Sequence, residues 1–313
     1  MGPLPTAGGA GDGGGACVAV RRGDSSAQGP GSVARVDKDR VDAGGPHPGC
    51  PAAREETVGT AYEQLRAAVP QAPVVHTDDT GWRVGGEPAF LTPFETDTAT
   101  VYQVRPRHRH EAVQEVIPAD YGDVVVTDPG CSYNAQVFDD VQQQKCLAHV
   151  LLSISSVVET KTGRARDFGD QLKALLQDAP ELWRAHRDAQ AMNFKAEAEA
   201  LQAELTYQLR DRRLQDLDNE RLLNELGWHH DRGHVLRFLV DPRIEPTNNG
   251  VASALCPAAI ARQMSHCSKN GRGAHAFAAF TSVVRTLAKR GVNTLVEDLY
   301  HLCQPPNLQS VAP

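Results

Sequence analysis

Aromatic residues and long apolar runs are scarce in this sequence. Aromatics make up 5% of its 313 residues, so a large aromatic-lined ligand pocket is not the first expectation. No apolar run approaches the roughly 18–20 residues that span a bilayer, and the first residues lack the charged-then-apolar pattern of a secretory signal. We therefore expect a cytoplasmic protein without a membrane partner.

Acidic residues are also missing locally, although the formal net charge is −7. Residues 246–296 and 98–110 contain no Asp or Glu, so each stretch offers uncompensated cations to a polyanion such as DNA. The alternative is a solvated basic face that is balanced by acidic neighbours in space. The candidate DNA-binding residues are Arg105, Arg107, Arg109, Arg262, Lys269 and Arg272.

The chain divides into segments of different composition. Residues 1–55 are rich in Gly, Pro and Ala with almost no periodic apolar positions, which predicts a disordered low-complexity tail. Residues 56–150 carry the strand patterns of the first part of an α/β core, and 151–240 read as a helical insertion with two long helices within 181–226. Residues 241–300 would complete the core with basic helices, followed by a tail over 301–313.

Short apolar runs and turn signals predict the strands of this core. We expect strands at 74–77, 81–84, 89–93, 101–104 and 123–127, with a hairpin turn at Gly85-Gly86. Helices are expected at 58–69, 110–117, 258–264 and 274–289, and the chain should turn helical from about residue 141. Strands thus dominate the first half and helices the second.

Two aspartates directly follow buried-strand patterns. Asp78 comes after VVHT and Asp128 after VVVT, the position where α/β sheets usually place their chemistry. Two carboxylates brought together there would hold Mg²⁺ or Mn²⁺, and a pair of such ions is the standard device for phosphoryl transfer. Alternatively, each Asp is simply a turn former or a helix cap.

Four sequence blocks, in order, resemble the IS66 group of bacterial insertion-sequence transposases. They are HTDDTGWRV (76–84), VVVTDPGCSYN (124–134), CLAHVLL (146–152) and the block from 241 to 274 that contains EPTNN. The resemblance implies an RNase H-like mixed sheet whose Asp-Asp-Glu triad binds two divalent metals for DNA strand cleavage and transfer. It also implies DNA as the partner, a nucleoid location and a possible homo-oligomer on DNA.

Carried over by position, the resemblance gives individual residues their expected roles. Asp78 and Asp128 would be metal ligands, whereas Asp79 stands where the family has a neighbouring Glu. Cys146 and His149 would form the family's Cys-x-x-His block, and they lack the two further ligands that a zinc site needs.

The third carboxylate of the triad is missing. Counted from the EPTNN block, the catalytic Glu falls on Ala252, which has no oxygen to offer a metal, and the cations that follow it fall on Ser253, Cys256 and Gln263. Glu245 lies seven residues upstream, about 10 Å along a helix, and is a poor substitute. The family's N-terminal zinc module and helix-turn-helix have no counterpart in this sequence either.

Three hypotheses follow from these residues. The chain is an impaired metal-dependent transposase core, a non-catalytic DNA-binding remnant of one, or an unrelated metal-dependent α/β phosphohydrolase. The third leaves the EPTNN block unexplained.

Overall fold

A computed structural model describes residues 51–188, 193–210, 216–265 and 267–291. The expected tail over 301–313 and most of the expected tail over 1–55 lie outside these residues. Helix α1 (Pro51–Ala68) begins inside the segment that we expected to be tail, so the predicted boundary at residue 55 is too late. Within the described part of the chain, no helix is long and apolar enough to cross a membrane.

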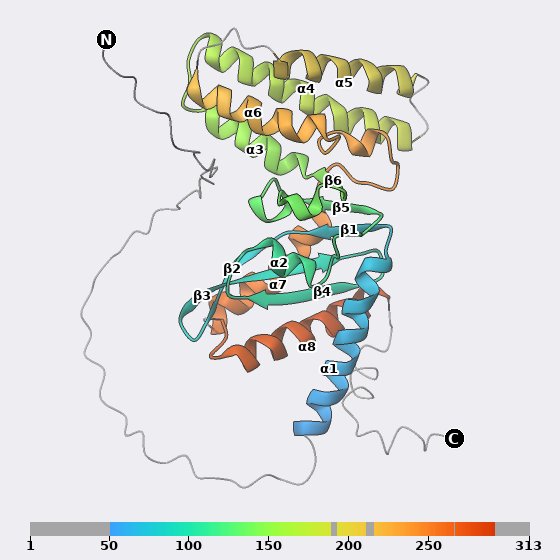
Figure 1. The fold of residues 1–313 in the computed structure, drawn as a ribbon, viewed down its shortest axis with the longest axis vertical. Helices are drawn as coiled ribbons and strands as arrows, with labels where there is room; N and C mark the ends of the chain where they lie inside the picture. Colours follow the sequence, from blue (N-terminus) through green and yellow to red (C-terminus); the bar gives the residue numbers. More distant parts are fainter. Residues whose placement is uncertain (1–50, 189–192, 211–215, 266, 292–313) are drawn as a thin grey trace, which may run out of the picture. The chain divides into compact units, whose positions relative to one another are not determined.

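A mixed six-stranded sheet forms the centre of the fold (Figure 1). Its strands are β1 (Val74–Thr77), β2 (Thr80–Val84), β3 (Glu87–Glu95), β4 (Thr100–Arg105), β5 (Val124–Thr127) and β6 (Gln142–Lys145). Strand β3 pairs antiparallel with β1, β2 and β4. Strand β5 pairs parallel with β1, and β6 pairs parallel with β5. The sheet is mixed, as the resemblance implied.

Strands β1 and β2 behave as one long strand with a short gap. Thr77 pairs with Phe94 and Thr80 pairs with Leu91, so the four residues from Thr77 to Thr80 match the four residues from Phe94 to Leu91 on β3. The gap holds Asp78 and Asp79, which therefore lie between two strands that stay in register with β3 rather than in a free loop. The predicted hairpin is confirmed, because Gly85 and Gly86 have φ of 62° and 90°, which favour glycine.

Strand β6 was not predicted, because its sequence QQQK is wholly polar. All but its first residue are nevertheless buried, since their side chains are satisfied inside the protein. The Gln144 amide donates to the carbonyl of Val235, and the Lys145 ammonium donates to Thr127 Oγ1 at 3.0 Å and to Gln143 Oε1 at 2.8 Å. Hydrogen bonding rather than apolar patterning thus places this strand, so our expectation of helix from residue 141 was wrong.

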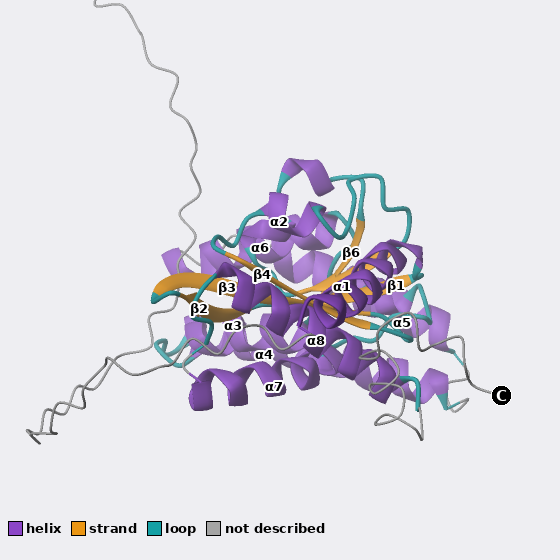
Figure 2. Ribbon diagram, turned by 90° about the horizontal axis from the view of Figure 1, so that it is seen from below, coloured by secondary structure: helices purple, strands orange, loops and turns teal. Residues whose placement is uncertain are grey.

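Helices cover both faces of the sheet (Figure 2). One face, including Val75, Phe94 and Val125, packs against α1 and α2 (His110–Gln114). The opposite face packs Val74 and Val124 against α3 (Leu147–Val158), and Trp82 and neighbouring residues against α7 (Asn249–Ser265) and α8 (Gly271–Lys289). Alternation along each strand therefore decides which helix layer a side chain meets.

The helical insertion lies between Asp128 and Ala252, as predicted, and three long helices follow α3 in it, two of which begin within residues 181–226, where two were expected. These are α4 (Arg164–Arg187), α5 (Phe194–Arg210) and α6 (Leu217–Asp231), side by side in Figure 1. Pro180 lies inside α4, which runs through it while Leu176, Ala179 and Trp183 are buried on both sides of that position. Packing outweighs the lost backbone hydrogen bond there.

The outer edge of β4 is closed by hydroxyl groups of α8. Ser282 Oγ accepts from the amide of Tyr102 at 2.8 Å, and Thr286 Oγ1 accepts from the amide of Thr100 at 3.0 Å. All four residues are buried. An open strand edge that would otherwise invite pairing with another chain is thereby covered.

Contact between α3 and α4 depends on a residue without a side chain. A Cβ built on Gly169 would lie 2.4 Å from Cγ2 of Val158, which is buried and stiff because it is β-branched. We expect Gly169→Ala to lower the free energy of unfolding by about 1–3 kcal/mol through overpacking, despite the better helix propensity of Ala. Urea unfolding monitored by circular dichroism measures this.

Gly227→Ala is the matched control, because nothing lies within 4 Å of a Cβ at that position of α6. It should stabilise the protein by about 0.5–1 kcal/mol. Equal effects of the two substitutions would contradict the packing argument.

Candidate metal centre

Three carboxylates meet where β1 and β5 end. Asp78, Asp79 and Asp128 each offer an oxygen, and these atoms all lie within 4.8 Å of one another. The juxtaposition follows from the parallel pairing of β1 with β5, which brings both carboxyl ends to the same edge of the sheet. It is the one such group of potential metal ligands among the residues that the structure describes. The structure thus brings together the two aspartates selected from the sequence.

Asp79 also belongs to this cluster, although the resemblance placed it only beside a metal ligand and not as a ligand itself. Its Oδ1 lies 3.1 Å from Nε2 of His108, whose ring stacks on Phe90 and meets Tyr133 edge-on. His108 was not singled out from the sequence. The only signal was its place among the arginines of residues 98–110, which says nothing about contact with Asp79.

Burial and nearby negative charge raise the pKa values of two of these carboxyls, Asp78 and Asp79. Burial raises the pKa of Asp79 to about 7, with further increases from the charges of Asp128 and Asp78. Burial also raises the pKa of Asp78, with a smaller contribution from Asp128. Half-buried carboxylates this close together are costly to ionise unless a cation lies among them. Three hard oxygen donors fit Mg²⁺ or Mn²⁺.

Asn248, from the EPTNN block, ties three parts of the chain together beside this cluster. Its side-chain amide donates to the carbonyl of Thr77 at 2.8 Å, and its Oδ1 accepts from Nδ1 of His76 at 3.0 Å. Its backbone amide donates to Sγ of Cys146 at 3.2 Å. The start of α7 is thereby fixed to the end of β1 and the start of α3, and the sequence motif had given no such role.

The Cys-x-x-His pair lies at the start of α3, on the same side. Hydrogen bonding with Cys146 raises the pKa of His149 to about 9, with smaller increases from the charges of Asp78 and Asp128. Burial alone would raise the pKa of the Cys146 thiol, but hydrogen bonds from His149 and the Asn248 amide lower it overall. The thiol is thus engaged within the protein, and the described residues offer no set of zinc ligands around it.

Ala252, to which the resemblance assigns the third carboxylate position, lies on α7. Ala252 is exposed, and its amide donates to the carbonyl of Asn248, one helical turn earlier. Asn248 contacts the end of β1 through Thr77, so Ala252 lies one helical turn along the chain from that contact. Glu245 is exposed and is not among the clustered carboxylates, so the structure does not bring it to the missing position.

The predicted basic residues are not equally available to a polyanion. Arg105 pairs with Glu115, which also accepts from Arg66, so this cation has an acidic neighbour in space, and its role in DNA binding stays a prediction. Arg107, Arg109, Lys269 and Arg272 are exposed. Arg262 is exposed as well, and it donates to Thr80 Oγ1 and to the Gly81 carbonyl, next to the carboxylates.

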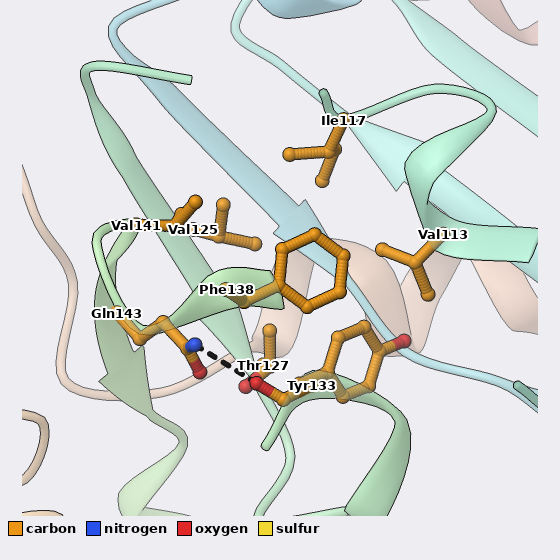
Figure 3. A pocket seen from close by; sticks show the side chains of 8 residues that line it. All are labelled: Val113, Ile117, Val125, Thr127, Tyr133, Phe138, Val141 and Gln143. Carbon is orange, nitrogen blue, oxygen red and sulfur yellow. Dashed lines mark hydrogen bonds between the residues drawn. The ribbon is translucent and has the colours of Figure 1, made fainter. Parts of the chain in front are cut away.

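On the sheet face that packs against α2, side chains fill the space beside the cluster. Figure 3 shows apolar side chains, among them Val125, Phe138 and Val141, converging on a cavity of only about 10 Å³. Gln143 crosses its edge and donates to the carbonyl of Tyr133 at 2.9 Å. A space that holds at most one water is packing rather than a ligand site.

Comparison with known proteins places this site in a family. The family model of the IS66 transposases ("Transposase IS66 family") matches residues 52–276, whereas no curated protein matches the chain. Similar solved structures include the HTLV-2 integrase catalytic core domain in complex with magnesium, in a trimeric and a dimeric form. The trimeric form is 13% identical, covering 28% of this chain and 68% of that chain, with a TM-score of 0.21. The dimeric form is 12% identical, covering 31% and 83%, with a TM-score of 0.21. Because the family model spans more than half of the sequence, the chain belongs to the IS66 family of transposases.

Proposed function

We propose that this chain is a DNA-binding transposase core that holds Mg²⁺ or Mn²⁺ but is impaired in DNA strand cleavage and transfer. The observation that carries the proposal is the meeting of Asp78, Asp79 and Asp128 at one edge of the sheet, while the α7 position offers only the methyl group of Ala252. Membership of the IS66 family supplies the reaction class.

Asp78 and Asp128 would hold the metal, and Asp79 would add a third oxygen. A bound divalent ion supplies charge neutralisation and an activated oxygen nucleophile for phosphoryl transfer. The protein's own contribution is to fix the carboxylates through the β1–β5 pairing and through Asn248. Without a carboxylate at residue 252, the side facing α7 has no protein ligand, so a second ion is poorly held.

Exposed cations around this edge suit the phosphates of DNA. Arg107 and Arg109 precede α2, and Arg262, Lys269 and Arg272 come from the end of α7 and the start of α8. Both groups extend from elements next to the carboxylates, since His108 contacts Asp79 and Arg262 contacts Thr80. A non-catalytic DNA-binding remnant is the second candidate, and Ala252 is the observation that favours it.

Metal-free stability should depend on pH through Asp79. A carboxyl whose pKa is raised on folding destabilises the fold as pH rises from its ordinary value of 3.8 through about 7. In EDTA we therefore expect the wild type to lose stability between pH 4 and pH 7.5, and Asp79→Asn to lose less. Urea unfolding at both pH values measures the difference, and millimolar Mn²⁺ should stabilise the wild type more than the variant.

Asp139→Asn is the control for that experiment, because Asp139 is exposed and is not part of the cluster. It should follow the wild type in both pH dependence and Mn²⁺ response. A pH dependence of stability that Asp79→Asn leaves unchanged would contradict its assignment to the carboxylate cluster.

Restoring the missing carboxylate tests the impairment directly. Ala252→Glu should raise Mn²⁺ affinity about tenfold, or about 1.4 kcal/mol, and should give metal-dependent nicking of supercoiled DNA that the wild type lacks. Calorimetric titration and gel electrophoresis measure these two effects. The exposed position should tolerate the change with little loss of stability.

Ser253→Glu is the matched control, since it adds the same charge one residue further along α7 and about 100° around the helix. It should change neither metal affinity nor nicking. Equal effects at the two positions, or nicking by the wild type at the rate of Ala252→Glu, would refute the proposed impairment.

A further inference from the structure

A cavity of about 420 Å³ lies at the base of the β2–β3 hairpin. It is lined by residues of both strands, among them Gly81, Trp82, Pro88 and Phe90, and by Arg262 of α7 and Cys267 of the segment that follows. The volume falls within the range of small-molecule sites in proteins. Neither the predicted metal ligands nor the strand-cleavage chemistry accounts for it.

The far wall of this cavity is held in place by hydrogen bonds to β2. The amide of Gly85 donates to the carbonyl of Ser268 at 2.9 Å, and the amide of Ser268 donates to the carbonyl of Arg83 at 3.0 Å. The indole of Trp82 donates to Ser268 Oγ at 3.1 Å. Cys267 is held with φ of 74°, a conformation that non-glycine residues rarely adopt. These hydrogen bonds fix the wall of the cavity relative to β2.

Its lining combines an apolar surface with cations. Pro88, Phe90 and Trp82 supply the apolar part, and Trp82 is stiffened by stacking on Phe277 at 4.9 Å between ring centroids. Arg83 and Arg262 supply positive charge, and no acidic residue is among the described lining residues. A planar ring that carries a negative group satisfies both halves of this surface.

The cavity adjoins the carboxylate cluster. Gly81 follows Asp79 by two residues, and Arg262 bridges Thr80 Oγ1 and the Gly81 carbonyl at 3.2 and 2.8 Å. On the other side, the Phe90 ring stacks at 5.4 Å on the His108 ring, whose Nε2 lies 3.1 Å from Asp79. The cavity is therefore placed to take the nucleotide that neighbours, in the same DNA strand, a phosphate held at the carboxylates.

We propose that this cavity takes one unstacked nucleotide of the DNA, with the base against Phe90 and Pro88 and its phosphate on Arg262. The inference rests on the proposed function, because it takes DNA as the substrate. Stacking on an aromatic wall is tolerant of sequence, since every base has a π-face. The cavity thus favours DNA in which a base is unpaired over a blunt duplex.

Cys267 provides a reporter inside the cavity, because its thiol is free and partly exposed. The full-length protein is alkylated with iodoacetamide alone, with a blunt 20-base-pair duplex, or with the same duplex carrying one unpaired thymidine. Mass spectrometry follows Cys267, and fluorescence anisotropy establishes saturation with each DNA. We expect the unpaired thymidine to slow alkylation of Cys267 about tenfold relative to the blunt duplex and to tighten binding about tenfold.

Arg262→Ala should abolish both differences, whereas Arg221→Ala, which removes an exposed arginine from α6, should leave them intact. Saturating DNA that leaves Cys267 equally reactive, or equal protection by both DNAs, overturns the inference while leaving the proposed function standing. Protection without any Mn²⁺ response or nicking in Ala252→Glu would instead overturn the proposed function alone. Failure of every DNA to bind would overturn both.

Discussion

Asn248 is the contact on which the arrangement of the site depends. One side chain and its backbone amide join the end of β1, the start of α3 and the start of α7, segments that lie far apart in the sequence. Because Asn248 is buried, each of these hydrogen bonds is costly to lose. They fix where the first turn of α7, and hence residue 252, lies relative to Asp78.

The sheet brings three carboxylates together at one place. Parallel pairing of β1 with β5 and the unbroken register of β1 and β2 along β3 force three carboxylates together, and burial raises the pKa of Asp79 to about 7. The free-energy cost of ionising buried carboxylates is tolerated at sites that gain from a bound cation. In the proposed site, Ala252 adds no further negative charge to this cluster and offers no ligand to a metal.

Much of the sheet was predictable, because apolar alternation and the Gly85-Gly86 turn are local signals. The carboxylates at 78 and 128 were found because they follow such strands. Strand β6 was missed because burial of QQQK depends on partners such as Val235 and Thr127, which no local pattern reveals. Likewise, the pairing of Arg105 with Glu115 and of His108 with Asp79 is tertiary. Low aromatic content also gave no hint of the cavity beside Trp82 and Phe90, since a few well-placed rings are enough.

In the proposed function, the edge of the sheet at Asp78 and Asp128 is a divalent-metal site with no protein ligand on one side. An anomalous difference map from crystals soaked in millimolar Mn²⁺ tests it most directly. We predict one strong peak bridging Asp78 and Asp128, with a second peak toward residue 252 only in Ala252→Glu. The absence of a peak at these carboxylates, or two fully occupied peaks in the wild type, would contradict the account.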